Sequence, residues 1–490
     1  MKKLFLLLLL MVAVSVHATE NPVLTIEGGQ VQGVLADDHP DVFVYRGIPY
    51  AAPPIRENRW REPQPIVPWK GVKICDTFGR PSYQAIQYTG GYYTEWGYGK
   101  EAAFSEDCLY LNVWTKAPGQ IDKKLPVALW IHGGGYREGF GSEPEFDGQE
   151  WGAKDVVLVS INYRLGVFGF LIHPALTAES PHHVSGNYGI LDQIEALKWI
   201  KKNIAQFGGD PDNVTIFGQS AGGGSVRTLC ESPLARGLFH KAVIMSAQGL
   251  SIPDANGNMV GGRYSGGTFA DAEAKAKKMF DWAGLTDLEK MRAASTETVF
   301  ALNTLYHQIN SDGQPAGMPM MFRGLPFMPM IDGYVSEKSF DDATRGGTLA
   351  DVPYMIGFTL NDMGNMAPNI AEFCKVREQK GGKAWAYEFA RVLFRSKGAF
   401  HSSDLWFVFK SLKHCWRPWT QGDWDLSEKM LTAWTNFVKY SDPNGPQGGA
   451  WAPCSAQNTK FMVFKLNDKD AEASFFGDPE IAPRPQGFPF

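Results

Sequence analysis

The sequence has few cysteines, and none of them stand in the arrangements that bind metal ions. Its 490 residues include 6 Cys and 10 His, but no Cys-x-x-Cys pair occurs and the cysteines do not cluster with histidines. Because zinc sites need such ligands at close spacing, the sequence does not favour a zinc site.

A strong excess of charge is also missing, since 47 Lys and Arg face 52 Asp and Glu, a net charge of −5. Such a balance gives no reason to expect nucleic acid or an anionic membrane surface as a partner. Internal repeats and low-complexity linkers are absent too. This favours one large domain with long insertions over two separable domains.

Long apolar runs are confined to the first residues. Lys2 and Lys3 precede an apolar stretch from Leu4 to Val16, and Val16-His17-Ala18 has the small residues of a signal-peptidase site. The stretch is too short to span a bilayer, so we expect a secretory signal peptide over residues 1–18 and a single domain over 19–490. The mature protein is then exported, periplasmic or extracellular, without integral membrane association.

Strand-like and helix-like stretches alternate along the first half of the chain. Apolar runs predict strands at Leu109–Trp114, Pro126–Ile131, Val156–Asn162, Val214–Phe217 and Lys241–Ser246. A helix over Leu191–Phe207 has its apolar residues on one face. This alternation predicts an α/β fold, with a mostly parallel central β-sheet flanked by helices. Further helices are expected at Ala270–Ala283 and Leu288–Ala294, and further strands at Pro353–Gly357 and Phe461–Phe464.

A Gly-x-Ser-x-Gly pattern follows the strand that ends at Phe217. Gly218 and Gly222 remove side chains where a strand turns sharply into a helix, which leaves Ser220 on an exposed corner. Taken alone, the pattern also occurs by chance and in plain turns. Upstream, a buried strand runs into the glycine loop 132–135 (HGGG), whose backbone N–H groups can approach a substrate oxygen. Together the two segments predict a serine nucleophile and an oxyanion hole.

The order of catalytic residues in such folds is nucleophile, acid, base, which limits the candidates for the base. After Ser220 the chain offers His240, His307, His401 and His414. We expect His240 on the helix that the serine opens, His307 in a loose insertion and His414 on a helix. His401 lies in a glycine-led loop and is the favoured base, with a solvated loop histidine as the alternative.

Two aspartates compete for the role of the acid. Asp362 follows the strand-like run that ends near Gly357, and Asp332 ends another strand-like run at Met330-Ile331. A carboxylate at the end of a strand can reach the histidine from either position. Spacing alone favours Asp362 and leaves Asp332 as its main competitor.

Long segments of the chain resemble the type B carboxylesterases, the α/β-hydrolase family that includes carboxylesterases and cholinesterases. The similarity extends from about residue 23 to about residue 465, and the segments follow the order of that family. They are YRGIPYA at 45–51, SEDCLYLNV at 105–113, WIHGGGY at 130–136, NYRLGVFGF at 162–170, GNYGILDQ at 186–193, FGGDPDNVTIFGQSAGG at 207–223, GAFHSSDLWFVF at 398–409 and WTNFVKYSDPNG at 434–445.

The resemblance implies roles for individual residues. Ser220 matches the nucleophile and His401 the base, and the oxyanion-hole donors match Gly134, Gly135 and Ala221. The acid of the family is usually Glu, and Asp362 occupies its position. The resemblance also implies a structural salt bridge between Arg46 and Glu106.

The cysteines depart from the family pattern. The first disulfide of the family joins the cysteine at Cys108 to a position that is Ser82 here, and the nearby Cys75 is expected to take its place. The segment from Tyr83 to Phe104 does not resemble the cholinesterase version, so choline-ester specificity is not expected.

The combined prediction is a secreted serine carboxylic-ester hydrolase that needs no cofactor and acts through a Ser-His-Asp triad and an acyl-enzyme. Its expected substrate is a small-molecule or polysaccharide-linked ester, and no nucleic acid partner is expected. Tyrosines and a tryptophan between Tyr88 and Tyr98 weakly favour a cleft for aromatic acyl groups or sugar rings, although packing within the loop explains them more simply. The alternatives are a lipase acting on acylglycerols and a non-catalytic cholinesterase-like interaction protein.

Overall fold

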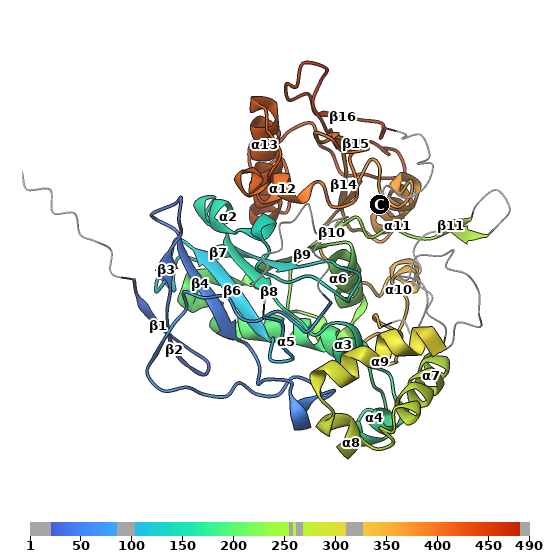
Figure 1. Ribbon diagram of the computed structural model, residues 1–490. Helices are drawn as coiled ribbons and strands as arrows, with labels where there is room; N and C mark the ends of the chain where they lie inside the picture. The colour runs from blue at the N-terminus through green and yellow to red at the C-terminus, as the bar shows by residue number, and fades with distance from the viewer. Residues whose placement is uncertain (1–20, 86–102, 254–257, 261–267, 310–326, 481–490) are drawn as a thin grey trace, which may run out of the picture.

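The computed structural model describes residues 21–85, 103–253, 258–260, 268–309 and 327–480. An 11-stranded sheet in the order β16-β15-β14-β13-β10-β9-β7-β8-β6-β4-β3 runs through the molecule (Figure 1). The strands from β15 to β8 are parallel to one another, whereas β6, β4 and β3 at one edge and β16 at the other are antiparallel to their neighbours. The parallel centre agrees with the alternation of strands and helices in the sequence.

The strands of this sheet are β3 (Val34–Leu35), β4 (Phe43–Pro49), β6 (Tyr110–Thr115), β7 (Leu125–Ile131), β8 (Val157–Ile161), β9 (Gly209–Gln219), β10 (Lys241–Met245), β13 (Tyr354–Thr359), β14 (Ala384–Phe389), β15 (Phe461–Phe464) and β16 (Phe475–Gly477). Two smaller sheets consist of β1 (Val23–Ile26), β2 (Gly29–Gln32) and β5 (Val72–Ile74), and of β11 (Ile252–Pro253) and β12 (Met259–Val260). The predicted strands are present within one to five residues of their expected ends.

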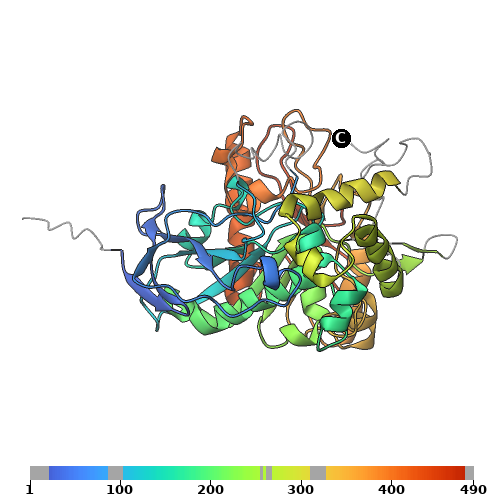
Figure 2. The same cartoon turned by 60° about the horizontal axis from the view of Figure 1, so that its bottom comes forward.

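The helices are α2 (Gln149–Ala153), α3 (Gly166–Phe170), α4 (Pro174–Glu179), α5 (Tyr188–Asn203), α6 (Ala221–Glu231), α7 (Phe269–Trp282), α8 (Leu288–Ala293), α9 (Thr296–Ile309), α10 (Phe340–Gly346), α11 (Ala367–Gln379), α12 (Leu405–Val408) and α13 (Gln421–Tyr440). Helices α7, α8 and α9 lie at the opposite end of the molecule from the N-terminal strands (Figure 2). No helix among the described residues is long and apolar enough to cross a membrane.

Successive side chains of a strand point to opposite faces of the sheet. In the central strands both sets of side chains are buried. In β9, Ile216 packs with the core that includes α5 and α6, and Phe217 packs with the core that includes α12 and α13. In β7, Leu129 packs in the core with α5 and α6, and Trp130 packs in the core with α12 and α13. Figure 1 shows α12 and α13 on one side of the sheet and α5 on the other. This burial explains the nearly continuous apolar runs in the sequence.

The disulfide expected between Cys75 and Cys108 is not formed, and both are free thiols. Cys75 packs against the N-terminal sheet, where its N–H donates to Gln32 O at 2.8 Å. Cys108 is fully buried and hydrogen-bonds the side chain of Ser82 instead. The two thiols therefore have separate surroundings.

The salt bridge expected between Arg46 and Glu106 is also wrong. The carboxylate of Glu106 pairs with Arg59 in a two-pronged contact, with Nε to Oε2 at 2.6 Å and Nη2 to Oε1 at 2.5 Å. Arg46 instead donates to Asp76 O at 3.2 Å and lies over the ring of Phe78. A guanidinium does bind the carboxylate of Glu106, but it comes from Arg59 in the segment that follows β4.

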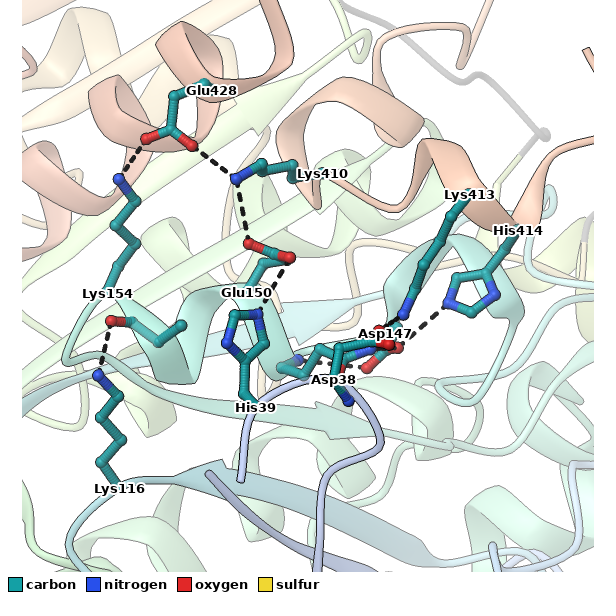
Figure 3. Close-up of polar contacts among 12 residues, drawn as sticks. Asp38, His39, Lys116, Asp147, Glu150, Lys154, Lys410, Lys413, His414 and Glu428 are labelled. Carbon is teal, nitrogen blue, oxygen red and sulfur yellow. Dashed lines mark hydrogen bonds and ion pairs between the residues drawn. The ribbon is translucent and has the colours of Figure 1, made fainter. Parts of the chain in front are cut away.

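Charged side chains connect distant parts of the chain around α2 (Figure 3). Lys410 lies between Glu150 and Glu428, at 3.3 Å and 2.7 Å. Glu150 also contacts His39 at 3.1 Å, and Glu428 also contacts Lys154. This group, here called the α2 charge network, joins the N-terminal loop to α13.

Candidate active site

Ser220 stands at the sharp turn between β9 and α6. Its φ of 57° and ψ of −122° are strained for a residue with a side chain. The turn is tight because a Cβ on Gly222 would overlap the carbonyl oxygen of Ile131, and one on Gly218 would lie 2.6 Å from the carbonyl carbon of Gly222. The N–H of Ser220 donates to Met245 O of β10 at 2.9 Å, which fixes the turn to the next strand. The predicted elbow geometry is thus present.

The glycine loop that follows β7 lies directly against this turn. A Cβ on Gly133 would lie 3.1 Å from the Cβ of Ser220. Gly134 and Gly135 have φ of 99° and 62°, a region that favours glycine. His132 secures the start of the loop, since its Nδ1 lies 2.8 Å from Gly133 O and its ring stacks on Tyr163.

Three backbone N–H groups near Ser220 are free to bind a ligand oxygen. Within the described part of the chain, no acceptor bonds the N–H of Gly134, Gly135 or Ala221. Ala221 is the first residue of α6, so the partial positive charge of the helix N-terminus adds to its N–H. These are the donors that the sequence assigned to the oxyanion hole.

His401 and Asp362 form a buried pair. His401 Nδ1 lies 2.7 Å from Asp362 Oδ1, and the two residues are 7% and 4% exposed. The other ring nitrogen, Nε2, lies 3.2 Å from the side-chain Nε2 of Gln219, the residue just before Ser220. An amide N–H donates, so this pattern fits the tautomer with its proton on Nδ1 and a lone pair on Nε2. A general base needs that tautomer.

Electrostatics favour an ionised aspartate beside this histidine. Burial alone would raise the pKa of Asp362, but the charge and hydrogen bond of His401 outweigh it and lower that pKa. Burial alone would lower the pKa of His401, and the same carboxylate reverses the effect and raises it. His132 has no such partner, and burial lowers its pKa to about 4, so it stays neutral.

The competing acid, Asp332, is engaged elsewhere. Its Oδ1 accepts three backbone N–H bonds from residues 334–336, and its Oδ2 accepts from Asn187 Nδ2 at 2.8 Å. Its role is to close a local turn and anchor the start of α5. The structure therefore pairs Asp362, and not Asp332, with His401.

The remaining candidate histidines lie in other places. His240 is not on α6 as expected, because it precedes β10 and exchanges two hydrogen bonds with Val214. His414 ends a short 3-10 helix at Leu412–His414 and contacts Asp147 at 3.2 Å. His307 belongs to α9, and its side chain lies outside the described residues, as does most of the aromatic segment from Tyr83 to Phe104.

Sequence reasoning missed several residues that hold the pair in place. Asn361 Oδ1 accepts from Ala399 N at 2.9 Å, and the backbone N–H of Asn361 donates to Ala399 O at 2.9 Å. This clamp joins the segment of Asp362 to the loop of His401. Adjacency in the sequence was the available signal, since Asn361 precedes Asp362 just as Gln219 precedes Ser220.

A further acid, Asp404, interacts electrostatically with both members of the pair. It is fully buried, and its Oδ2 accepts from Tyr387 OH at 3.2 Å. Burial and the charge of Asp362 raise the pKa of Asp404 to about 7. No group of three or more metal-ligating side chains gathers among the described residues.

Comparisons with known proteins give the family context. The model of the carboxylesterase family matches residues 20–377 and 369–477. The chain is 30% identical to para-nitrobenzyl esterase of Bacillus subtilis over 502 residues, covering 95% of this chain and 98% of that protein. It is 36% identical to fumonisin B1 esterase of Sphingopyxis macrogoltabida over 332 residues, 68% of this chain and 54% of that protein. The match to that second relative thus spans only about half its length.

Solved structures agree with the arrangement of the sheet. A structure of a PNB esterase has a TM-score of 0.75 at 25% identity and covers 93% of this chain and 97% of that chain. A carboxylesterase of Geobacillus stearothermophilus has a TM-score of 0.72 at 28% identity with the same coverage. The fold is the α/β-hydrolase fold predicted from the sequence.

Proposed function

Since the chain belongs to the carboxylesterase family, we propose that it hydrolyses carboxylic esters through Ser220, His401 and Asp362. The observation that carries this proposal is the buried His401–Asp362 pair, whose outer nitrogen faces the residue before Ser220. The free N–H groups of Gly134, Gly135 and Ala221 support it further.

The reaction proceeds in two halves. Ser220 Oγ attacks the ester carbonyl carbon while His401 Nε2 takes its proton, and the carbonyl oxygen becomes an oxyanion held by the three N–H groups. The imidazolium then protonates the departing alcohol, which leaves an acyl-enzyme. Water attacks that intermediate by the same route and releases the acid. Throughout, Asp362 holds the imidazole tautomer and stabilises its protonated form.

The direct test is the substitution Ser220→Ala assayed with a p-nitrophenyl ester. We expect turnover to fall by a factor of about 10⁴ or more, because the nucleophile is lost. Circular dichroism should show an unchanged fold. Activity that survives in a folded Ser220→Ala variant would refute the assignment.

The substrate is proposed to be a small-molecule or polysaccharide-linked ester. A panel of short acyl, long acyl, feruloyl, acetyl-sugar and fumonisin B1 esters would separate these classes, the last because a relative bears that name. Emulsified triglyceride tests the lipase alternative through interfacial activation. An inactive wild type on every ester would favour the non-catalytic alternative.

Export is part of the proposal and is supported by the basic and apolar start of the sequence. Expression of the full chain followed by cell fractionation tests it. The protein is expected outside the cytoplasm with its first residues removed, near residue 18. Full-length protein retained in the cytoplasm would contradict export without affecting the proposed chemistry.

A further inference from the structure

Gln84 makes an unusual set of contacts for a loop glutamine. It is 6% exposed and lies between β5 and β6, far in sequence from the glycine loop that follows β7. Its Oε1 accepts from Gly139 N at 2.8 Å, and its Nε2 donates to Gly139 O at 3.1 Å. Nε2 also donates to Ser82 O at 3.0 Å. The side-chain amide thus pairs with the peptide groups of Gly139 as a neighbouring strand would.

Gly139 follows the glycine loop in sequence and packs against its first two residues, His132 and Gly133. With φ of 98° it adopts a backbone that favours glycine, and a Cβ there would lie 2.6 Å from His132 Nδ1 and 2.9 Å from Gly133 O. The chain between Gly134 and Gly139 forms a turn, in which the N–H groups of residues 137 and 138 both donate to Gly134 O, at 3.0 and 3.1 Å. A shift of Gly139 therefore moves Gly133 and Gly134.

Gly133 in turn lies against Ser220, so the contacts run without a gap from Gln84 to the reacting centre. We propose that Gln84 is a positioning residue that sets where the N–H groups of Gly134 and Gly135 meet the oxyanion. This inference rests on the proposed function, because it assigns those N–H groups to the oxyanion hole.

The segment that carries Gln84 is held in place by hydrogen bonds to other parts of the fold. Its neighbour Ser82 accepts from Leu165 N at 3.1 Å and forms a β-bridge with Ser105.

Oxyanion stabilisation depends on preorganised donors, and loss of one whole donor lowers kcat by about 10²–10³. Donors that are present but displaced should cost less, so we expect a loss of about 10-fold to 50-fold.

The experiment compares Gln84→Met, Gln84→Ala and Gln84→Glu with wild type on p-nitrophenyl acetate. Methionine keeps the volume and removes all three hydrogen bonds, whereas glutamate keeps the acceptor for Gly139 N and should be intermediate. Kinetic constants are referred to active sites titrated with a fluorophosphonate, which removes any effect of misfolded protein. The control is Gln64→Met, a half-buried glutamine whose amide bonds Glu62 O instead.

We expect kcat per titrated site to fall about 10-fold or more in Gln84→Met, while KM changes less than about 3-fold. The affinity for a trifluoromethyl ketone, which forms an oxyanion adduct with the serine, should weaken by the same factor as kcat/KM falls. Gln64→Met should match wild type in both measurements.

Wild-type kcat per titrated site in Gln84→Met would overturn the proposal, as would a rise in KM alone, which indicates substrate contact. If Gln84→Ala does not fold, Gln84→Met and Gln84→Glu carry the same test. A wild type without esterase activity would instead refute the proposed function, and that outcome is visible before any Gln84 variant is compared.

Discussion

Asp362 and Asp332 occupy similar places in the sequence, but their carboxylates have different partners in the fold. Asp362 faces His401 at 2.7 Å, whereas Asp332 accepts backbone N–H groups of its own turn. At the scale of single residues, this difference predicts a role in proton transfer for Asp362 and a role in stability for Asp332. Replacing Asp362 by asparagine should therefore lower activity, whereas the same replacement of Asp332 should lower stability.

We expect Asp362→Asn to lower kcat by a factor of about 10³–10⁴, because the imidazole loses both its tautomer and its counter-charge. Asp332→Asn should retain kcat within about 3-fold and lower the melting temperature instead. Steady-state kinetics with thermal unfolding of both variants checks this. The larger kcat loss in Asp332→Asn would exchange the two roles.

The same pair predicts the pH profile of kcat/KM. His401 acts as a base only when neutral, and Asp362 raises its pKa above the ordinary value of 6.5. Activity should therefore fall as the pH drops through a value above 6.5. Whatever activity Asp362→Asn retains should fall at a lower pH than in wild type. An acid limb that does not move would show that another group controls it.

The buried carboxyl group of Asp404 should make the free energy of unfolding depend on pH. Its pKa rises from 3.8 in the unfolded chain to about 7 when buried, so the folded state binds more protons between these values. The free energy of unfolding then decreases as the pH rises from about 4 to about 7. Asp404→Asn removes this loss and should be more stable than wild type at pH 8, by on the order of 2–4 kcal/mol.

Calorimetric melting at pH 5 and pH 8 measures this effect. The advantage of Asp404→Asn should be larger at pH 8, since the amide can still accept the Tyr387 hydrogen bond. An equal change at both pH values would mean that lost packing or hydrogen bonding decides the result.

At the scale of helices and strands, an aromatic cluster supports the two strands that lead to the glycine loop and to Ser220. Phe409, just after α12, packs on Trp130 of β7 and Phe217 of β9, with ring centres 5.0 and 5.8 Å away. Trp151 of α2 stacks on Phe217 as well, at 4.9 Å. β7 ends in the glycine loop and β9 ends at Ser220, so this cluster holds both ends from one face.

Phe409→Ala should lower the free energy of unfolding by about 3–5 kcal/mol, because it leaves a cavity under these strands. Urea unfolding measures the loss, and Phe394→Ala, at a ring that is 46% exposed, is the control. We expect kcat per folded molecule to stay close to wild type at 25 °C. A loss below about 1 kcal/mol would mean that neighbouring rings close the cavity.

The parallel centre of the sheet was predictable because strands buried on both faces have continuous apolar sequences, as in β7 and β8. Strand β14 was not identified, because its sequence AWAYEF contains the charged residue Glu388, although the glycine turn at Gly381-Gly382 precedes it closely. The catalytic roles of Ser220, His401 and Asp362 are predictions from motifs that are local in sequence, and the structure adds the contact between His401 and Asp362. Gln84, Asn361 and the true partner of Glu106 could not be predicted, because their contacts depend on packing between distant loops.

At the scale of the whole molecule, the α2 charge network joins segments from the two ends of the chain. Burial alone would lower the pKa of Lys410, but its hydrogen bond to Glu428 and the charge of Glu150 outweigh burial and raise it. The stabilisation from this lysine is therefore fully present at neutral pH and is lost only as the pH rises above about 10.5.

Lys410→Met should lower the free energy of unfolding by about 1 kcal/mol at low salt, and by less in 1 M NaCl, where surface charges are screened. Lys198→Met is the control, because Lys198 is more exposed and, in the part of the chain that the structure describes, pairs with Glu195 of its own helix. Urea unfolding at two salt concentrations gives both values. An effect independent of salt would assign the role of Lys410 to packing of its aliphatic stem.

The pairing of β10 with β13 has a consequence for any attempt to divide the protein. The exposed glycines Gly346 and Gly347 lie between these strands, after the elbow and before the acid and base. A chain cut there yields one fragment with Ser220 and the glycine loop and another with Asp362 and His401. Neither piece holds the complete proposed triad, so we expect ester cleavage to report that the two have reassembled along β10 and β13. The same fold that builds a hydrolase thus provides a split reporter.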